Sequence, residues 1–204
     1  MTNIKAIIFD LGKVVFDISF ERVFQSWATS SGRQLDDIKS RFMFDELFDK
    51  FERNEVTPEH FRATVSQRLD LKLTDQIFDK GWCDLYLDVY NKMDKLLVGL
   101  KRNYKLISLT NTNAIHYKVW TVKYANTLRH FEKIFSSHEL GTRKPESKIF
   151  EIALDYLKTK PEQTLFLDDN LDNINGAKEI GINTILVTSN AQMLKDIGKL
   201  TIIK

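Results

Sequence analysis

Close to its N-terminus the chain reads Ile7-Ile8-Phe9-Asp10-Leu11-Gly12-Lys13-Val14-Val15. The apolar run before Asp10 is typical of a buried parallel strand, and Gly12 allows the backbone to turn after it. In open α/β sheets, reacting groups lie just beyond the carboxyl ends of the strands, which is where Asp10 falls. Taken alone, the stretch fits a catalytic aspartate and a solvated turn aspartate equally well. Further polar residues that the rest of the chain brings to the same place would favour a catalytic aspartate.

The bulk composition is that of an ordinary globular chain and excludes several classes of function. The 204 residues carry a formal net charge of +2 and no basic block, so we expect neither nucleic acid nor a membrane as a partner. The single cysteine excludes an internal disulfide framework and a multi-thiolate metal site. No apolar run approaches the ~18 residues of a membrane span, and the N-terminus has no signal-peptide pattern. The expected location is cytoplasmic, and the expected state is a monomer or a weak homodimer.

Apolar residues recur at helical spacing through residues 17–90. The spacing predicts four helices, which begin near Phe20, at Leu35 (continuing through Phe51), after Thr57-Pro58, and near Ile77 (continuing to Val89). No strand is predicted in this segment. Four amphipathic helices in succession indicate a small helical bundle.

From Met93 onward the pattern alternates between amphipathic helices and short apolar strands. Strands are predicted at 106–109, 134–135, 164–167 and 184–187, with 200–203 as a candidate edge strand. Alternation of this kind implies a parallel sheet with helices on both faces. The predicted fold class is therefore α/β: a Rossmann-like parallel sheet core over residues 1–16 and 91–204, with residues 17–90 inserted as a four-helix domain.

Polar residues of complementary kinds follow three of the predicted strands: Asp10, Thr110-Asn111 and Asp168-Asp169. The carboxyl ends of parallel strands meet at one edge of a sheet, so we expect these side chains to converge. Carboxylates at Asp10 and Asp169 are hard oxygen ligands suited to Mg²⁺, while Thr110-Asn111 offers a hydroxyl and backbone amides to phosphate. Lys144, in the loop 141–145, would neutralise this concentration of negative charge. Each feature is common alone, whereas the combination is specific.

These residues resemble the four motifs of the haloacid dehalogenase superfamily. In chain order the motifs are Phe9-Asp10-Leu11-Gly12, Ser108-Leu109-Thr110-Asn111, Arg143-Lys144-Pro145, and Leu167-Asp168-Asp169-Asn170 through Asn173. They span the whole chain, and residues 17–90 resemble the small helical cap that the family inserts after the first motif. In detail the motifs are most similar to a bacterial branch that includes α-glucose-1-phosphate phosphatases.

The resemblance implies an enzyme, a Mg²⁺-dependent phosphomonoesterase acting on a small phosphate ester. A sugar phosphate such as a hexose 1-phosphate is the expected substrate. Asp10 would be the nucleophile, forming an aspartyl-phosphate, and also a metal ligand. The main-chain carbonyl of Gly12 and the carboxylate of Asp169 would be further metal ligands. Asp168 would hold the ligands in place without touching the metal, or would bind it through a water molecule.

The resemblance also implies how the substrate is held. Thr110 and Asn111 would bind the phosphoryl group, and Lys144 would act in both binding and catalysis by balancing its charge. Asn173 would support the fourth motif through hydrogen bonds.

Gly12 departs from the pattern of typical phosphatases of the family, which carry a second aspartate at this position as general acid and base. Such help is typically worth about 10²–10⁴ in rate. A good leaving group, a water molecule or a residue of the cap could compensate, and Asp17 is the nearest acidic side chain. Two alternatives therefore stay open. One is a non-catalytic phosphate-binding regulatory protein, and the other is a metal-free 2-haloacid dehalogenase, which has little use for Asp168-Asp169.

Specificity is expected to come from the cap. Arg22, Arg41, His116 and Trp120 are candidate substrate contacts, although surface or packing roles explain each of them more simply.

Overall fold

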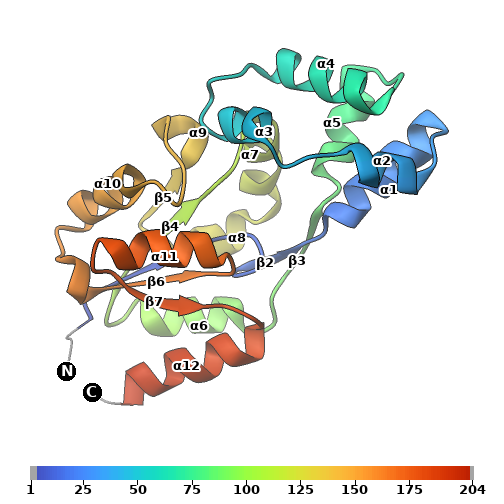
Figure 1. The fold of residues 1–204 in the computed structure, drawn as a ribbon. Coiled ribbons are helices and arrows are strands. Elements are labelled where there is room, and N and C mark those ends of the chain that lie inside the picture. Colours follow the sequence, from blue (N-terminus) through green and yellow to red (C-terminus); the bar gives the residue numbers. More distant parts are fainter. Residues whose placement is uncertain (1–3, 203–204) are drawn as a thin grey trace.

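The computed structural model describes residues 4–202, with side chains as far as residue 199. In this part of the chain a five-stranded parallel sheet forms the centre, with the strand order β5-β4-β1-β6-β7 (Figure 1). Its strands are β1 (Ala6–Phe9), β4 (Lys105–Thr110), β5 (Lys133–Ser136), β6 (Thr164–Asp168) and β7 (Asn183–Leu186). The predicted α/β class and the five predicted strands are confirmed, and the opening strand lies in the middle of the sheet.

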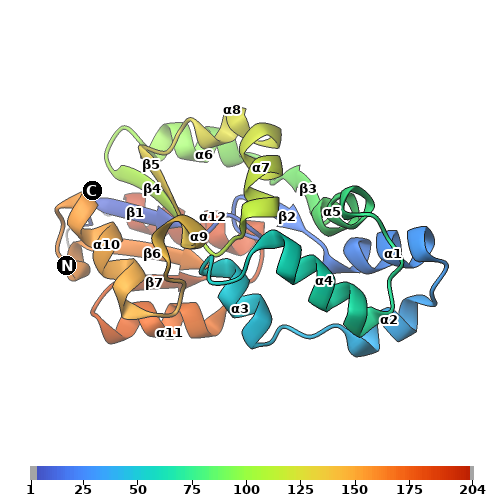
Figure 2. The same cartoon turned by 90° about the horizontal axis from the view of Figure 1, so that it is seen from above.

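Helices cover both faces of the sheet because successive strand residues point to opposite sides. Ala6 and Ile8 pack with α10 (Ser147–Leu157) and α11 (Leu171–Glu179). Ile7 and Phe9 belong to the cluster on the other face, together with α6 (Met93–Leu100), α7 (Ala114–Lys123) and α12 (Asn190–Ile202). Figures 1 and 2 show these two helical layers. The short connections include α8 (Ala125–Leu128), α9 (Ser137–Leu140) and a 3₁₀ turn at Pro161–Gln163. Among the described residues, no helix has the length and apolar character needed to cross a membrane.

Residues 17–90, all of them described, form five helices where four were predicted. They are α1 (Phe20–Ser31), α2 (Leu35–Arg41), α3 (Glu46–Glu52), α4 (Pro58–Leu69) and α5 (Asp75–Cys83). The second predicted helix is interrupted because Phe42 has an extended backbone and Asp45 starts a new helix. The Asp45 side chain accepts a hydrogen bond from the Leu47 amide at 3.2 Å, which is an N-cap.

The prediction that this segment contains no strand was wrong. β2 (Phe16–Ile18) and β3 (Tyr86–Val89) form an antiparallel ribbon in which Phe16 pairs with Val89 and Ile18 with Tyr86. The fourth predicted helix therefore stops at Cys83 rather than continuing to Val89. The apolar residues of β3 also fit helical spacing, and only their pairing with a distant strand selects the extended form. The ribbon joins the inserted helices to the core (Figure 1).

The candidate edge strand at 200–203 was also wrong over residues 200–202, which continue α12. Met193 and Ile197, four residues apart, are buried against the core and fix the helical register upstream. Ile203 lies outside the described residues.

Candidate active site

The predicted convergence of polar residues occurs at the carboxyl ends of β1, β4 and β6. These strands are parallel neighbours, so Asp10, Thr110 and Asp168 end at the same edge of the sheet. Carboxylate oxygens of Asp10, Asp168 and Asp169 lie within 4.8 Å of one another. Residues from distant parts of the sequence thus form one acidic cluster.

Lys144 lies at the centre of this cluster. Its ammonium group donates to Asp10 Oδ1 at 2.6 Å and to Asp168 Oδ2 at 2.7 Å, and the residue is only 1% exposed. Burial acts to lower the pKa of Lys144, but the two carboxylates outweigh it and raise the pKa above its ordinary value. The side chain therefore stays positively charged between two anionic groups.

Asn111 fixes the backbone that carries this lysine. Its Oδ1 accepts from the Lys144 amide and its Nδ2 donates to the Lys144 carbonyl, both at 2.9 Å. Both polar atoms of the Asn111 side chain are engaged in this way, so this side chain positions the backbone of Lys144. The Thr110 hydroxyl makes only a long 3.5 Å contact to the Asn111 carbonyl, which leaves it able to bind a ligand.

The two carboxylates of the fourth motif differ in their availability. Asp168 accepts hydrogen bonds from the Asn170 amide at 2.8 Å and from Asn173 Nδ2 at 3.1 Å, in addition to Lys144. Asp169 is half-buried and has a long contact of 4.0 Å with the ammonium group of Lys13. Asp168 is thus committed to holding the site together, whereas Asp169 has oxygens to offer.

The electrostatics of the cluster suit a divalent cation. Burial raises the pKa of Asp10 to about 7, with Asp168 and Asp169 adding to the effect and Lys144 opposing it. Burial and Asp168 also raise the pKa of Asp169. Closely spaced carboxylates disfavour each other's ionised form, and a bound cation relieves that repulsion. A donor set made of carboxylate oxygens matches the preference of Mg²⁺.

Gly12 lies in the turn that follows β1. The left-handed backbone of the turn falls on Lys13, with φ 57°, rather than on Gly12. A Cβ placed on Gly12 would lie 3.0 Å from Ile18 Cδ1. The space beside Gly12, where the resemblance places an acidic side chain, is thus occupied by the side chain of Ile18.

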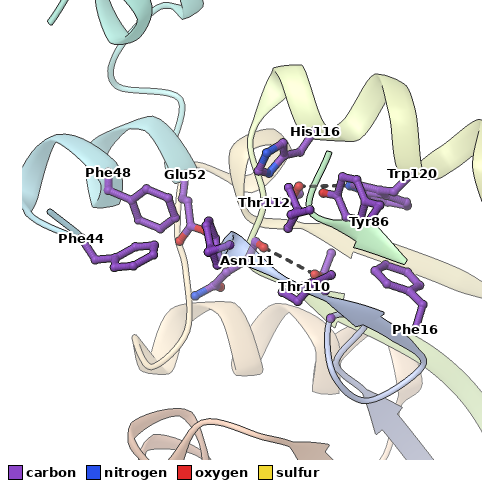
Figure 3. A pocket seen from close by; sticks show the side chains of 14 residues that line it. Phe16, Phe44, Phe48, Glu52, Tyr86, Thr110, Asn111, Thr112, His116 and Trp120 are labelled. Atoms are coloured by element: carbon purple, nitrogen blue, oxygen red, sulfur yellow. Dashed lines mark hydrogen bonds between the residues drawn. The ribbon is translucent and has the colours of Figure 1, made fainter. Parts of the chain in front are cut away.

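A cavity of about 200 Å³ lies between the end of β4 and the inserted helices (Figure 3). Gly12, Thr110 and Asn111 line it on the core side, and Phe44, Phe48 and Glu52 line it from α3 and the residues before it. The remaining lining residues are Phe16, Ile18, Phe20, Leu85, Tyr86, Thr112, His116 and Trp120. The cavity is therefore largely aromatic, with polar groups next to the strand ends.

The candidate substrate contacts divide into two groups. His116 and Trp120 line the cavity, whereas Arg22 and Arg41 do not. Arg22 instead donates to a backbone carbonyl of the inserted segment at 2.9 Å. Asp17 lines a separate hollow beside Asp169 and accepts from a tyrosine hydroxyl at 3.1 Å. Asp17 therefore does not face the cavity that contains Thr110 and Asn111.

Sequence reasoning missed Glu52, and it placed Arg143 in the third motif without giving it a role. Glu52 is the last residue of α3 and is buried, and its Oε2 accepts from Arg143 Nε at 2.8 Å. Arg143 also pairs with Asp49 of α3 at 2.8 Å. A signal was available, because Glu52 follows Phe48 by four residues and so lies on the apolar face of its helix.

A family model for haloacid dehalogenase-like hydrolases matches residues 4–181. The chain belongs to this family. The resemblance of its four motifs is thereby confirmed. Among curated relatives of this haloacid dehalogenase-like hydrolase is the D-ribitol-5-phosphate phosphatase of Bacteroides thetaiotaomicron. It is 26% identical over 201 residues, which cover 95% of this chain and 97% of the relative.

Solved structures agree with the family assignment. A haloacid dehalogenase family enzyme from Bacteroides thetaiotaomicron, in complex with magnesium and inorganic phosphate, matches with a TM-score of 0.79 and 29% identity, covering 92% of this chain and 96% of that one. A predicted family member from Porphyromonas gingivalis matches with a TM-score of 0.83 and 24% identity over 98% of both chains. The second match supports the fold.

Proposed function

We infer that this haloacid dehalogenase-like hydrolase is a Mg²⁺-dependent phosphatase that acts on small phosphate monoesters. The observation that carries the proposal is the position of Lys144, whose ammonium group bonds both Asp10 and Asp168 where β1 and β6 end. A cation fixed beside a carboxylate nucleophile is the arrangement that an incoming phosphoryl group requires. Similarity to a named phosphatase, and to an enzyme crystallised with magnesium and phosphate, supports the same activity.

In the proposed reaction Asp10 attacks phosphorus, the substrate oxygen leaves, and water then hydrolyses the aspartyl-phosphate. Lys144 keeps Asp10 oriented and offsets the negative charge of the phosphoryl group, which the Thr110 hydroxyl helps to bind. The Asp10 and Asp169 carboxylates and the main-chain carbonyl of Gly12 would hold Mg²⁺. The bound cation would supply further positive charge for the phosphoryl oxygens.

The cavity favours a small, uncharged leaving group such as a polyol or a sugar. Its volume is about 200 Å³, and its aromatic walls can contact the carbon skeleton of such a group. D-Ribitol 5-phosphate and a hexose 1-phosphate are the first substrates to test. In this proposal residues 17–90 form a cap domain that closes the cavity over a core made of residues 1–16 and 91–204.

A phosphate-binding protein without turnover is the second candidate, and the Ile18 side chain beside Gly12 is the observation that favours it. The metal-free dehalogenase is disfavoured by the acidic cluster, because carboxylates within 4.8 Å of one another would repel a haloacid anion.

A phosphate-release screen tests the proposal. Wild-type protein and Asp10→Asn are assayed against polyol phosphates, sugar phosphates and nucleotides, with Mg²⁺ and with EDTA. We expect turnover that disappears in the variant and in EDTA. Turnover that survives both changes would contradict the mechanism, and phosphate binding without turnover of any ester would favour the second candidate.

A further inference from the structure

The core provides no acidic side chain at the position beside Gly12. Ile18 fills the space there, with its Cδ1 3.0 Å from where a Cβ of residue 12 would lie. A leaving alkoxide nevertheless needs a proton, since an unactivated alcohol is a poor leaving group without one. A side chain in another part of the cavity wall could supply this proton.

The cavity wall contains three titratable side chains, those of Glu52, Tyr86 and His116. His116 Nδ1 is bonded to Asn113 Nδ2 at 3.1 Å, and Nε2 to the Trp82 carbonyl at 3.0 Å. Burial lowers the pKa of His116 to about 3, so the ring is neutral and both of its nitrogens are engaged. Burial also raises the pKa of Tyr86 well above its ordinary value. Glu52 is the remaining group.

One oxygen of Glu52 is held in position by Arg143. Glu52 Oε2 accepts the hydrogen bond from Arg143 Nε at 2.8 Å, and the Glu52 side chain lines the cavity. Figure 3 shows the side chain reaching from α3 toward Asn111 and the end of β4. Glu52 thus points from the inserted segment into the end of the cavity where the phosphoryl group is expected.

The surroundings keep this carboxyl group able to gain and lose a proton near neutral pH. Burial raises the pKa of Glu52 to about 7, and Arg143 opposes the rise. The other charged groups that act on it are Asp49 of the same helix and Lys144 of the core loop, and their effects have opposite signs. An Arg143 N–H can donate to Oε2 whether Glu52 is ionised or neutral, so the carboxyl group stays in place in both states.

We propose that Glu52 is the general acid and base of this site, a role that rests on the phosphatase function proposed above. Protonated Oε1 donates its proton to the ester oxygen while the phosphorus–oxygen bond breaks and Asp10 bonds to phosphorus. The resulting carboxylate then takes a proton from the water that attacks the aspartyl-phosphate. Asp10 departs as a carboxylate, phosphate is released, and Glu52 is protonated again. Arg143 acts as the positioning residue.

The test compares two esters that differ in their need for an acid. D-Ribitol 5-phosphate has a poor leaving group, whereas p-nitrophenyl phosphate has a good one that departs without a proton. The parameter is kcat/KM, which reports on the steps up to formation of the aspartyl-phosphate. Glu52→Gln should lower it about 10²–10⁴-fold for the alkyl ester but less than about threefold for the aryl ester. Glu52→Asp, which retains an acid, should recover part of the alkyl activity.

Asp49→Asn is the matched control, because Asp49 pairs with Arg143 from the same helix but does not line the cavity. Asp49→Asn should change kcat/KM for both esters by the same small factor. Equal losses for the two esters in Glu52→Gln, or no loss, would overturn the role of Glu52 while leaving the phosphatase function intact. Failure of the wild-type protein to hydrolyse any ester of the phosphate-release screen, p-nitrophenyl phosphate included, would overturn both proposals.

Discussion

Gly176 of α11 lies against Pro145 so closely that a Cβ on Gly176 would be 2.5 Å from the Pro145 carbonyl oxygen. Real Cβ atoms do not approach backbone oxygens to this distance, so only glycine fits. Because Pro145 follows Lys144, this contact packs the fourth-motif helix directly against the loop that carries Lys144 of the candidate site. The packing of α11 thus helps to set the position of the Lys144 ammonium group.

Gly176→Ala should therefore damage both stability and activity. We expect the free energy of unfolding to fall by about 1–3 kcal/mol, as for other over-packed sites, and kcat to fall as the loop shifts. Gly99→Ala is the control, since Gly99 lies in α6 with no atom near its Cβ position. That change should leave activity intact and raise stability by about 0.5–1 kcal/mol. Urea denaturation measures the unfolding free energy of both variants, and steady-state assays measure their kcat. Equal values of both quantities in the two variants would refute the packing argument.

Lys144→Met should remove activity and destabilise the fold. It leaves Asp10 and Asp168 buried side by side without the cation that bonds them at 2.6 and 2.7 Å. Loss of one partner from a buried ionic group typically costs roughly 3–5 kcal/mol. Denaturation at pH 8, where the carboxylates ionise most fully, measures the effect. The exposed Lys148→Met serves as control, and an unfolding free energy unchanged by Lys144→Met would contradict the central role of the ammonium group.

The core and most of its site could be predicted from sequence because their signals are local. Each reacting group follows an apolar strand, and parallel pairing alone then brings Asp10, Thr110 and Asp168 to one edge. The ribbon could not be predicted in this way, because Tyr86 and Val89 fit helical spacing until Phe16 and Ile18 pair with them. Short strands are selected by contacts that are distant in sequence.

The same limit applies to the inserted segment and to the cavity. The break before α3 depends on the cap made by Asp45, a signal that apolar spacing alone overlooks. The bond between Glu52 and Arg143 joins residues 91 positions apart, and neither position identifies the other. For Asn111 the motif correctly places the residue, but only the structure reveals that its side chain holds the backbone of Lys144.

The stability of the protein should depend on pH through Glu52. Burial raises the pKa of Glu52 from 4.5 to about 7 in the folded state. Asp49 also raises this pKa, whereas Arg143 and Lys144 lower it. The folded protein therefore holds a proton that the unfolded chain releases. This contribution is complete below the unfolded pKa and is lost as the pH rises from about 4.5 through about 7.

Glu52→Gln should remove that dependence. Between pH 4.5 and pH 8 the wild-type protein should lose on the order of 3 kcal/mol more unfolding free energy than the variant. Urea denaturation of both proteins in metal-free buffer gives the difference. Asp10 and Asp169 contribute equally to the pH dependence of both proteins, so the difference reports on Glu52 alone. Parallel curves across this pH range would show that Glu52 has an ordinary pKa.

Gly12→Asp should restore an acid to the core if the neighbouring space is opened. Ile18→Val is included because Ile18 Cδ1 would otherwise lie 3.0 Å from the new Cβ. Added to Glu52→Gln, the pair of changes should raise kcat/KM for D-ribitol 5-phosphate at least about tenfold. The control replaces Gly12→Asp by Gly12→Asn in the same background, because asparagine has the shape of aspartate but cannot act as an acid. Equal rates for the aspartate and asparagine versions would show that proton transfer does not limit the reaction.

The covalent step on Asp10 is the central claim, and its direct test is mass spectrometry of enzyme quenched in acid during turnover with Mg²⁺ and p-nitrophenyl phosphate. Asp10 is the proposed nucleophile and its carboxylate bonds Lys144, so we expect one phosphoryl group on the peptide that contains it. Asp10→Asn should give neither the adduct nor turnover. A phosphoryl group on a different residue, or rapid turnover with no adduct on any peptide, would contradict the account.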